Sequence, residues 1–255
     1  MGALTSFSFA GLDAGTLAYV VLVVFVAAVV RGYSGFGASA IMVTGLGLIL
    51  PPAEVVPIAL LLEIVASVGL LPQVWRAVAW RMVSWLSAGA VLGMPLGIAL
   101  LTRLPAGPMR ILISLLVLGA SLLIWFGYRF RGTPGGAHIF GTGIASGLAN
   151  GVAAVGGLPV VLFLLSAATS AVVSRATLIV YLMLGDIYGT GVAAANGLVT
   201  GDVVLRTALF AVPLVAGVIV GNRQFIKTSP DSFRRFTLLL LMTLASLGLV
   251  RGWIA

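Results

Sequence analysis

Two acidic residues, Glu63 and Asp186, stand far inside apolar segments of this chain, 123 residues apart. A carboxyl group in such a place must bind a proton, pair with a cation or face water, and carboxyl groups of this kind commonly serve ion or proton movement. Both residues are therefore candidate coupling sites that exchange protons during a working cycle. The alternative is a structural ion pair, in which Arg31 or Arg175 neutralises a buried acid and holds two helices together.

A polar stretch interrupts the first apolar run: "AAVVRGYSGFGASAIMV", residues 27–43, holds an arginine, a tyrosine, two serines and three glycines. Interrupted backbone at membrane depth is tolerated only where it is buried in protein or lines a wet cavity. A helix that restarts there points free amides and its positive dipole end into the cavity, which suits a small anion. Arg31 adds positive charge to this site, or else its side chain reaches the membrane surface from a helix end. Arg175 has the same two interpretations.

A second stretch, "GTGIASGLANGVAAVGGLPVVLFLL" at residues 141–165, is equally rich in glycine and equally interrupted. Two such breaks in corresponding positions point to the binding site of a secondary transporter. Glycine pairs spaced by four elsewhere, such as Gly93 with Gly97 and Gly217 with Gly221, favour close helix packing instead; Gly143 with Gly147 and Gly185 with Gly189 share that spacing. The predicted substrate-binding residues are Arg31, Ser34, Gly35, Gly37, Ser39, Asn150, Gly151, Gly156, Gly157 and Arg175.

The composition defines the elements that must position these residues. Of 255 residues, 61% are hydrophobic and 8% charged, and the mean hydropathy is +1.22. These values are typical of an integral membrane protein. Apolar runs of helix-spanning length recur without the alternation of a barrel strand, so we expect an all-α polytopic fold. About eight hydrophobic segments are predicted, at residues 12–50, 53–72, 83–103, 109–127, 137–166, 172–198, 205–224 and 233–253.

Several function classes are excluded by composition and motifs. The net charge of +8 is expected to set topology and to meet anionic lipid, not nucleic acid. The chain has no cysteine, which removes thiolate metal sites and cysteine nucleophiles. A single histidine, His138, and the lack of any Ser/His/Asp or HExxH arrangement argue against an enzyme and against a metal site. We expect no cofactor.

The chain reads as a duplication, with a first repeat at residues 1–130 and a second at 131–255. Ser34-Gly35 pairs with Ser146-Gly147 at a shift of 112, whereas "GMPLGIALLTRLPAGPMR" pairs with "GVIVGNRQFIKTSPDSFR" at a shift of 124. Each broken segment either crosses once or returns as a re-entrant hairpin. The positive-inside tendency favours the return, which inverts the halves. It puts Arg76, Arg81, Arg129, Arg131, Arg175, Arg223, Lys227, Arg234 and Arg235 on one face and Arg103, Arg110, Arg206 and Arg251 on the other.

Several stretches resemble the sulfite exporter TauE/SafE family across nearly the whole chain. They are "RGYSGFGASAIMV", "LPPAEVVPIALLLEIVAS", "GMPLGIALLTRL", "SGLANGVAAVGGLPVVLFLL" and "SRATLIVYLMLGD". The resemblance implies a bacterial inner-membrane permease, usually with eight predicted spans, that moves sulfite, sulfonates such as sulfoacetate, or related small oxyanions.

The sequence therefore predicts a secondary transporter in the bacterial plasma membrane that exports small sulfur-containing anions by alternating access of two homologous halves. A passive anion channel, an uptake permease for another small organic anion, and a scaffold or sensor whose glycines only pack helices are the alternatives. Lipid and a small anion are the expected partners, and a homo-oligomer is possible.

Overall fold

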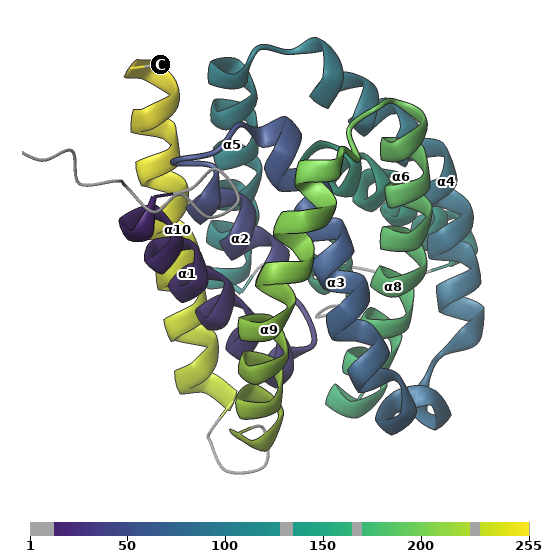
Figure 1. Ribbon diagram of the computed structural model, residues 1–255. Coiled ribbons are helices and arrows are strands. Elements are labelled where there is room, and N and C mark those ends of the chain that lie inside the picture. The colour runs from purple at the N-terminus through teal and green to yellow at the C-terminus, as the bar shows by residue number, and fades with distance from the viewer. Residues whose placement is uncertain (1–12, 128–134, 165–169, 225–229, 255) are drawn as a thin grey trace, which may run out of the picture.

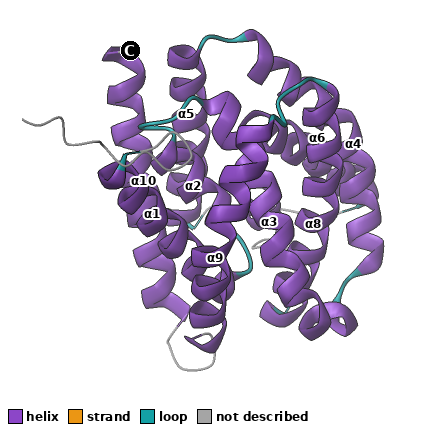
Figure 2. Cartoon of the chain, in the orientation of Figure 1, coloured by secondary structure: helices purple, strands orange, loops and turns teal. Residues whose placement is uncertain are grey.

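The computed structural model describes residues 13–127, 135–164, 170–224 and 230–254, and every regular element in them is a helix. The helices pack side by side in one bundle (Figures 1 and 2). Six of the described helices are long and apolar enough to cross a membrane. The all-α polytopic fold predicted from composition is therefore confirmed.

The helices before the segment at residues 128–134 comprise one broken element and three long helices. The break separates α1 from α2, and a short 3₁₀ helix, η1, follows α3. Their bounds are α1 Ala14–Ser34, α2 Ala38–Leu46, α3 Pro52–Val74, η1 Trp75–Ala77, α4 Trp80–Arg103 and α5 Ala106–Trp125.

The helices after that segment follow the same order. A broken element, α6 and α7, comes first and three long helices follow it. Their bounds are α6 Gly136–Ala153, α7 Gly157–Leu164, α8 Ala171–Ala195, α9 Gly201–Gln224 and α10 Pro230–Ile254.

Left-handed backbone conformations end both α1 and α6. Gly35 and Gly37 have φ of 81° and 90°, which glycine adopts at little cost because it lacks a Cβ. Ala154, directly after α6, has φ of 54° and is the one non-glycine residue with positive φ in the described part of the chain. An L-residue there carries about 1–2 kcal/mol of strain. The left-handed conformation at the second break is therefore stabilised by contacts with the rest of the protein and not by the residue type at position 154.

The first broken element is a re-entrant hairpin. The Tyr19 hydroxyl, near the start of α1, donates to the Gly45 carbonyl near the end of α2, at 3.0 Å. Val23 also packs on Gly45, where a Cβ would lie 2.9 Å from its Cγ1. Because α2 returns toward the start of α1, the element begins and ends at one face of the bundle, where α3 begins.

The second broken element enters from the opposite face. Gly136, at the start of α6, packs on Trp85 near the start of α4. The start of α8 lies on the same face, since the Ala79 amide between α3 and α4 donates to Thr177 Oγ1 at 3.1 Å. The re-entrant topology favoured by the charge distribution predicts Arg110 and Arg206 on the first face and Arg175 on the second. The contacts agree, because Arg110 binds Gly47 at the end of α2, Arg206 pairs with Glu54 at the start of α3, and Arg175 binds Asn222 near the end of α9. Arg129, Arg131 and Lys227 lie outside the described residues.

Glycines line two matching helix contacts, between α4 and α6 and between α1 and α9. A Cβ at Gly93 would lie 2.1 Å from the Ile144 carbonyl oxygen, and one at Gly221 would lie 2.0 Å from that of Val29. The packing interpretation is confirmed for Gly93, Gly97, Gly143, Gly147, Gly217 and Gly221. It is wrong for Gly185, where a Cβ would have only the Asn150 amide nitrogen nearby, at 3.8 Å.

The predicted count of eight segments is not confirmed. Among the described residues, the six long apolar helices are α1, α3, α4, α5, α8 and α9, and α6 and α10, which lie in two of the eight predicted segments, are not among them. The helices α2 and α7, which the prediction placed within the first and fifth segments, have nine and eight residues and at 1.5 Å per residue reach only about 12–14 Å into a hydrocarbon core of about 30 Å. The shift of 112 is also wrong for the breaks, because Ser34 and Ala153, the last residues of α1 and α6, are 119 residues apart. Ser146 and Gly147 lie within α6, before its break.

Candidate substrate site

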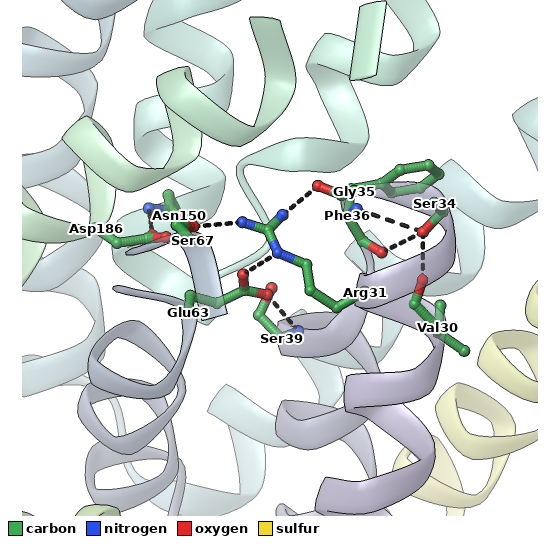
Figure 3. Close-up of polar contacts among 10 residues, drawn as sticks. All are labelled: Val30, Arg31, Ser34, Gly35, Phe36, Ser39, Glu63, Ser67, Asn150 and Asp186. Atoms are coloured by element: carbon green, nitrogen blue, oxygen red, sulfur yellow. Dashed lines mark hydrogen bonds and ion pairs between the residues drawn. The ribbon is translucent and has the colours of Figure 1, made fainter. Parts of the chain in front are cut away.

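Arg31, one turn before the first break, is fully buried and its charge is neutralised within the protein. Its Nε lies 2.9 Å from Glu63 Oε2 on α3. The other guanidinium nitrogens donate to the Ser67 hydroxyl at 2.7 Å and to the Gly35 carbonyl (Figure 3). Arg31 therefore does not reach the membrane surface, and the structural ion pair is the interpretation that the contacts bear out.

The second oxygen of Glu63 occupies the amide end of α2. Glu63 Oε1 accepts the Ser39 backbone amide at 2.9 Å, in the first turn of the restarted helix. A carboxylate is favourable there because it meets free amides and the positive end of the helix dipole. The anion position predicted at the first break is thus filled by the chain's own carboxylate.

Ser34 serves the local backbone of the first break. Its hydroxyl lies 2.7 Å from the carbonyl oxygens of Val30 and Phe36 and accepts the Phe36 amide at 3.3 Å. Gly37, at the cap of α2, continues the turn because its carbonyl accepts the Ile41 amide at 3.2 Å. These contacts satisfy backbone hydrogen-bonding groups within the turn itself.

Asn150 holds the second break and stands three residues before the end of α6, as Arg31 stands three before the end of α1. Its amide nitrogen donates to Asp186 Oδ1 on α8 at 2.9 Å, and its oxygen accepts the Gly156 amide at 3.0 Å. Asp186 is 1% exposed, and its Oδ2 has no hydrogen-bond partner among the described residues. A neutral amide thus stands where the first half has a cation.

The two breaks meet inside the bundle. A Cβ on Gly157, the first residue of α7, would lie 3.5 Å from the Cβ of Phe36 in the first break. Asp186 lies within electrostatic reach of Glu63 and Arg31, and Figure 3 shows the Asn150–Asp186 pair on one side of the guanidinium with Gly35 on the other. Arg31, Glu63, Asn150 and Asp186 are each at most 2% exposed, so the polar centre is closed to both faces.

Two predicted residues lie at the edge of this centre. Arg175 donates to the Gly32 carbonyl at 2.8 Å and to Asn222 Oδ1 at 3.0 Å, and its Cγ covers Gly35, where a Cβ would lie 2.9 Å away. Gly151 faces α4, and its Cβ would meet the Met94 carbonyl oxygen at 2.4 Å. Packing alone accounts for glycine at 151.

Four hydroxyl groups of the site were missed at the level of sequence. Ser67 follows Glu63 by four residues and Thr190 follows Asp186 by four, a helical spacing that puts each pair on one face. The Thr190 hydroxyl, like Asp186 Oδ2, is buried without a partner among the described residues. Tyr181 donates to the Ser146 hydroxyl at 2.6 Å, and Ser146 donates to the Gly156 carbonyl at 2.5 Å. The repeated acid-to-hydroxyl spacing is the signal that could have found the first two.

The chemistry of these donors fits an oxyanion. Backbone amides, hydroxyls, a side-chain amide and a guanidinium all donate hydrogen bonds to negatively charged oxygen. The described part of the chain contains no group of three or more His, Asp or Glu residues that could hold a metal ion.

Of three comparisons with known proteins, the comparison with family models agrees with the resemblance seen in the sequence. The comparisons with curated proteins and with solved structures found no match. The family model for the sulfite exporter TauE/SafE matches residues 20–247, which include both breaks, the two buried acids and Arg175. The chain therefore belongs to the sulfite exporter TauE/SafE family of membrane transporters.

Proposed function

We propose that this protein is a secondary transporter that exports small sulfur-containing anions, such as sulfite or organosulfonates including sulfoacetate, from the bacterial cytoplasm. The substrate binds between the two helix breaks, and access alternates between the faces as two homologous halves, residues 1–130 and 131–255, move relative to each other. Family membership supports the transporter class and the substrate class.

The meeting of the two breaks carries the proposal. Two re-entrant elements enter from opposite faces and bring Phe36 and Gly157 into contact beside a buried polar centre. Half-helix termini that meet inside a bundle are the usual location of a transporter site. Because the centre is closed to both faces, release of substrate requires a movement that opens one face at a time.

The membrane potential favours the proposed direction for an anion that moves alone. With a potential of 100 mV, negative inside, outward movement of one negative charge gains about 2.3 kcal/mol. Uptake of the same anion requires a co-transported cation.

Ligand-dependent stability of the purified protein tests the substrate class. A ligand that binds only the folded state at 100 times its Kd stabilises it by about 2.7 kcal/mol. We expect sulfite or sulfoacetate to raise the melting temperature, with sulfate and simple carboxylates as comparison anions and taurine as a sulfonate without net charge. The shift is expected to vanish in Asn150→Ala and to persist in Gly119→Ala, where the added methyl meets open space. Equal shifts for every anion, or none, would contradict the substrate class.

Counterflow in proteoliposomes separates a transporter from an anion channel. Alternating access predicts saturable uptake of labelled sulfite that unlabelled sulfite on the opposite side accelerates, because the site must return through the closed state. A channel gives uptake proportional to the gradient without acceleration. Specific binding that is lost in Asn150→Ala counts against a scaffold or sensor, for which the breaks have no ligand.

A further inference from the structure

We propose that Asp186 is the proton-binding residue of this transporter, and that its neutral form joins Asn150 and the start of α7 in binding the substrate anion. The inference rests on the proposed function and assigns the coupling ion and the residue that carries it. Glu63, the other buried acid, has the fixed role of partner to Arg31.

The two buried acids differ in how their negative charge is compensated. Glu63 Oε1 accepts the amide of Ser39, and Oε2 has no hydrogen bond from the described residues but is neutralised by the ion pair with Arg31 Nε at 2.9 Å. Asp186 has Asn150 on Oδ1 and no partner on Oδ2 in the described chain, although it is 1% exposed. A buried carboxylate with neither a cation nor a second donor is strongly unfavourable. A proton on Oδ2 removes that charge.

Among the described residues, no cation forms an ion pair with Asp186. Arg31 on α1 is within electrostatic reach but is bound to Glu63 on α3, which is equally within reach and negative. On α8 itself, Arg175 stands in the first turns and donates to Gly32 and Asn222, and Tyr181 lies within electrostatic reach of Asp186 and donates to Ser146. The helices α3, α4, α6, α7 and η1 pack on α8. Their other titratable side chains stand at helix ends or in η1 (Glu54, Arg76, Arg81, Arg103 and His138), and α7 has none.

The start of α7 supplies the place for the anion. At the first break the chain's own carboxylate fills the amide end of α2, whereas at the second break the amide of Gly156 meets only the neutral oxygen of Asn150. The positive end of α7 therefore has no negative partner among the described residues. An oxyanion there meets a negative charge when Asp186 is ionised and a hydrogen-bond donor when Oδ2 carries a proton.

Proton and anion therefore bind together. The proton comes from water on the face to which the site is open, forms the O–H bond at Oδ2, and returns to water after the site opens to the other face. One proton with one univalent anion carries no net charge across the membrane. The membrane potential then contributes nothing to the movement of a univalent sulfonate, whose direction follows the combined gradients of anion and proton. Export therefore requires an outward gradient of the anion that exceeds any inward gradient of the proton.

The test measures binding of sulfoacetate and protonation of the carboxyl group separately, in purified full-length protein. We expect the apparent Kd to rise by about tenfold per pH unit above the midpoint of titration, the limit for one linked proton. Asp186→Asn, which resembles the neutral acid, is expected to bind with little dependence on pH. Asp202→Asn, which alters an exposed acid at the start of α9, is the matched control and is expected to behave as the wild type.

Infrared difference spectra on changing pH supply a readout that needs no substrate. The carboxylic-acid band of a buried protonated group is expected in wild-type protein and in Asp202→Asn and to be absent in Asp186→Asn. The inference is overturned if the band persists in Asp186→Asn, or if that variant keeps the pH dependence of binding. If the band titrates and disappears in Asp186→Asn but no sulfur anion binds any of the proteins, the proton site stands and the proposed substrate class fails.

Discussion

The two helix breaks have similar geometry but differ in charge, because one contains an ion pair and the other a neutral amide beside an acid. Each is preceded at three residues by a polar side chain, Arg31 or Asn150, that contacts an acid on the long helix after the break. In the first half the contact is an ion pair that neutralises the charge of Glu63. In the second half it is a neutral amide that leaves Asp186 Oδ2 without a partner among the described residues.

The difference indicates that the two breaks have different roles. A buried ion pair fixes helix positions, since separating its members leaves a charge in a medium that does not solvate it. A buried acid with one open oxygen can change charge without breaking an ion pair. The first break is therefore suited to be a fixed support, and the second to bind proton and substrate.

An all-or-none experiment tests the inverted entry of the two elements. The chain has no cysteine, so single cysteines report the side of each loop. We expect Thr102→Cys and Asn196→Cys to react with a membrane-impermeant maleimide from one side and Arg76→Cys from the other. If the second element crossed once instead of returning, Asn196→Cys would share the side of Arg76→Cys.

Loss of the first-half cation is expected to have the largest effect on stability. Arg31→Met leaves Glu63 buried without its partner, which costs about 3–5 kcal/mol. Asn150→Ala removes hydrogen bonds to one acid and one amide and costs about 1–3 kcal/mol. Chemical unfolding in detergent measures both. Recovery of stability in Arg31→Met combined with Glu63→Gln is the control, and equal losses in the two single variants would remove the contrast.

The glycine contacts of α4 with α6 and of α1 with α9 are expected to be equally intolerant of a methyl group. Gly93→Ala and Gly221→Ala each place a Cβ within 2.1 Å of a backbone oxygen, and such overpacking costs about 1–3 kcal/mol. Gly119→Ala, with no atom within 4 Å of the new Cβ, is the control in the same unfolding assay. A loss at only one of the two contacts would show that the halves pack differently.

The left-handed residues that follow α1 and α6 predict changes of opposite sign. Ala154→Gly relieves strain at φ of 54° and is expected to stabilise the protein by about 1 kcal/mol. Gly35→Ala introduces the same strain and also presses on Arg175, so it destabilises by at least that amount. Thermal unfolding of the two variants against wild type checks the signs. A destabilising Ala154→Gly would mean that the alanine methyl contributes packing that outweighs its strain.

The smallest expected effect concerns the starts of α1 and α6. Asp13 caps α1, where hydrogen bonds from the Thr16 hydroxyl and amide lower the pKa of its carboxyl group, whereas Gly135, the residue before α6, has no side chain to cap that helix. A lowered pKa stabilises the folded state above the unfolded value of about 4 and loses that contribution as pH falls through the folded value. A small drop in melting temperature below about pH 4 is expected in wild type and absent in Asp13→Asn.

Much of the fold follows from local sequence because its causes are local. Long apolar runs define α3, α4, α8 and α9, and the glycine stretches locate both breaks within a few residues. The alignment of the two repeats predicted from sequence was wrong in register. Matching Ser34-Gly35 to Ser146-Gly147 aligned letters, whereas the correspondence of Arg31 with Asn150 joins unlike residues that only their positions relative to the breaks and the acids reveal.

The sequence by itself determined that two acids and two glycine-broken helices lie inside a membrane bundle, since apolar length, glycine content and isolated charge are properties of a segment. It also left open whether each acid was a coupling site or an ion-pair partner. Only the tertiary structure decided that Arg31 neutralises Glu63, that Asp186 keeps an open oxygen and that α6 enters from the face opposite to α1. Pairing of buried charge depends on which helices adjoin, and packing between segments far apart in the chain sets that adjacency.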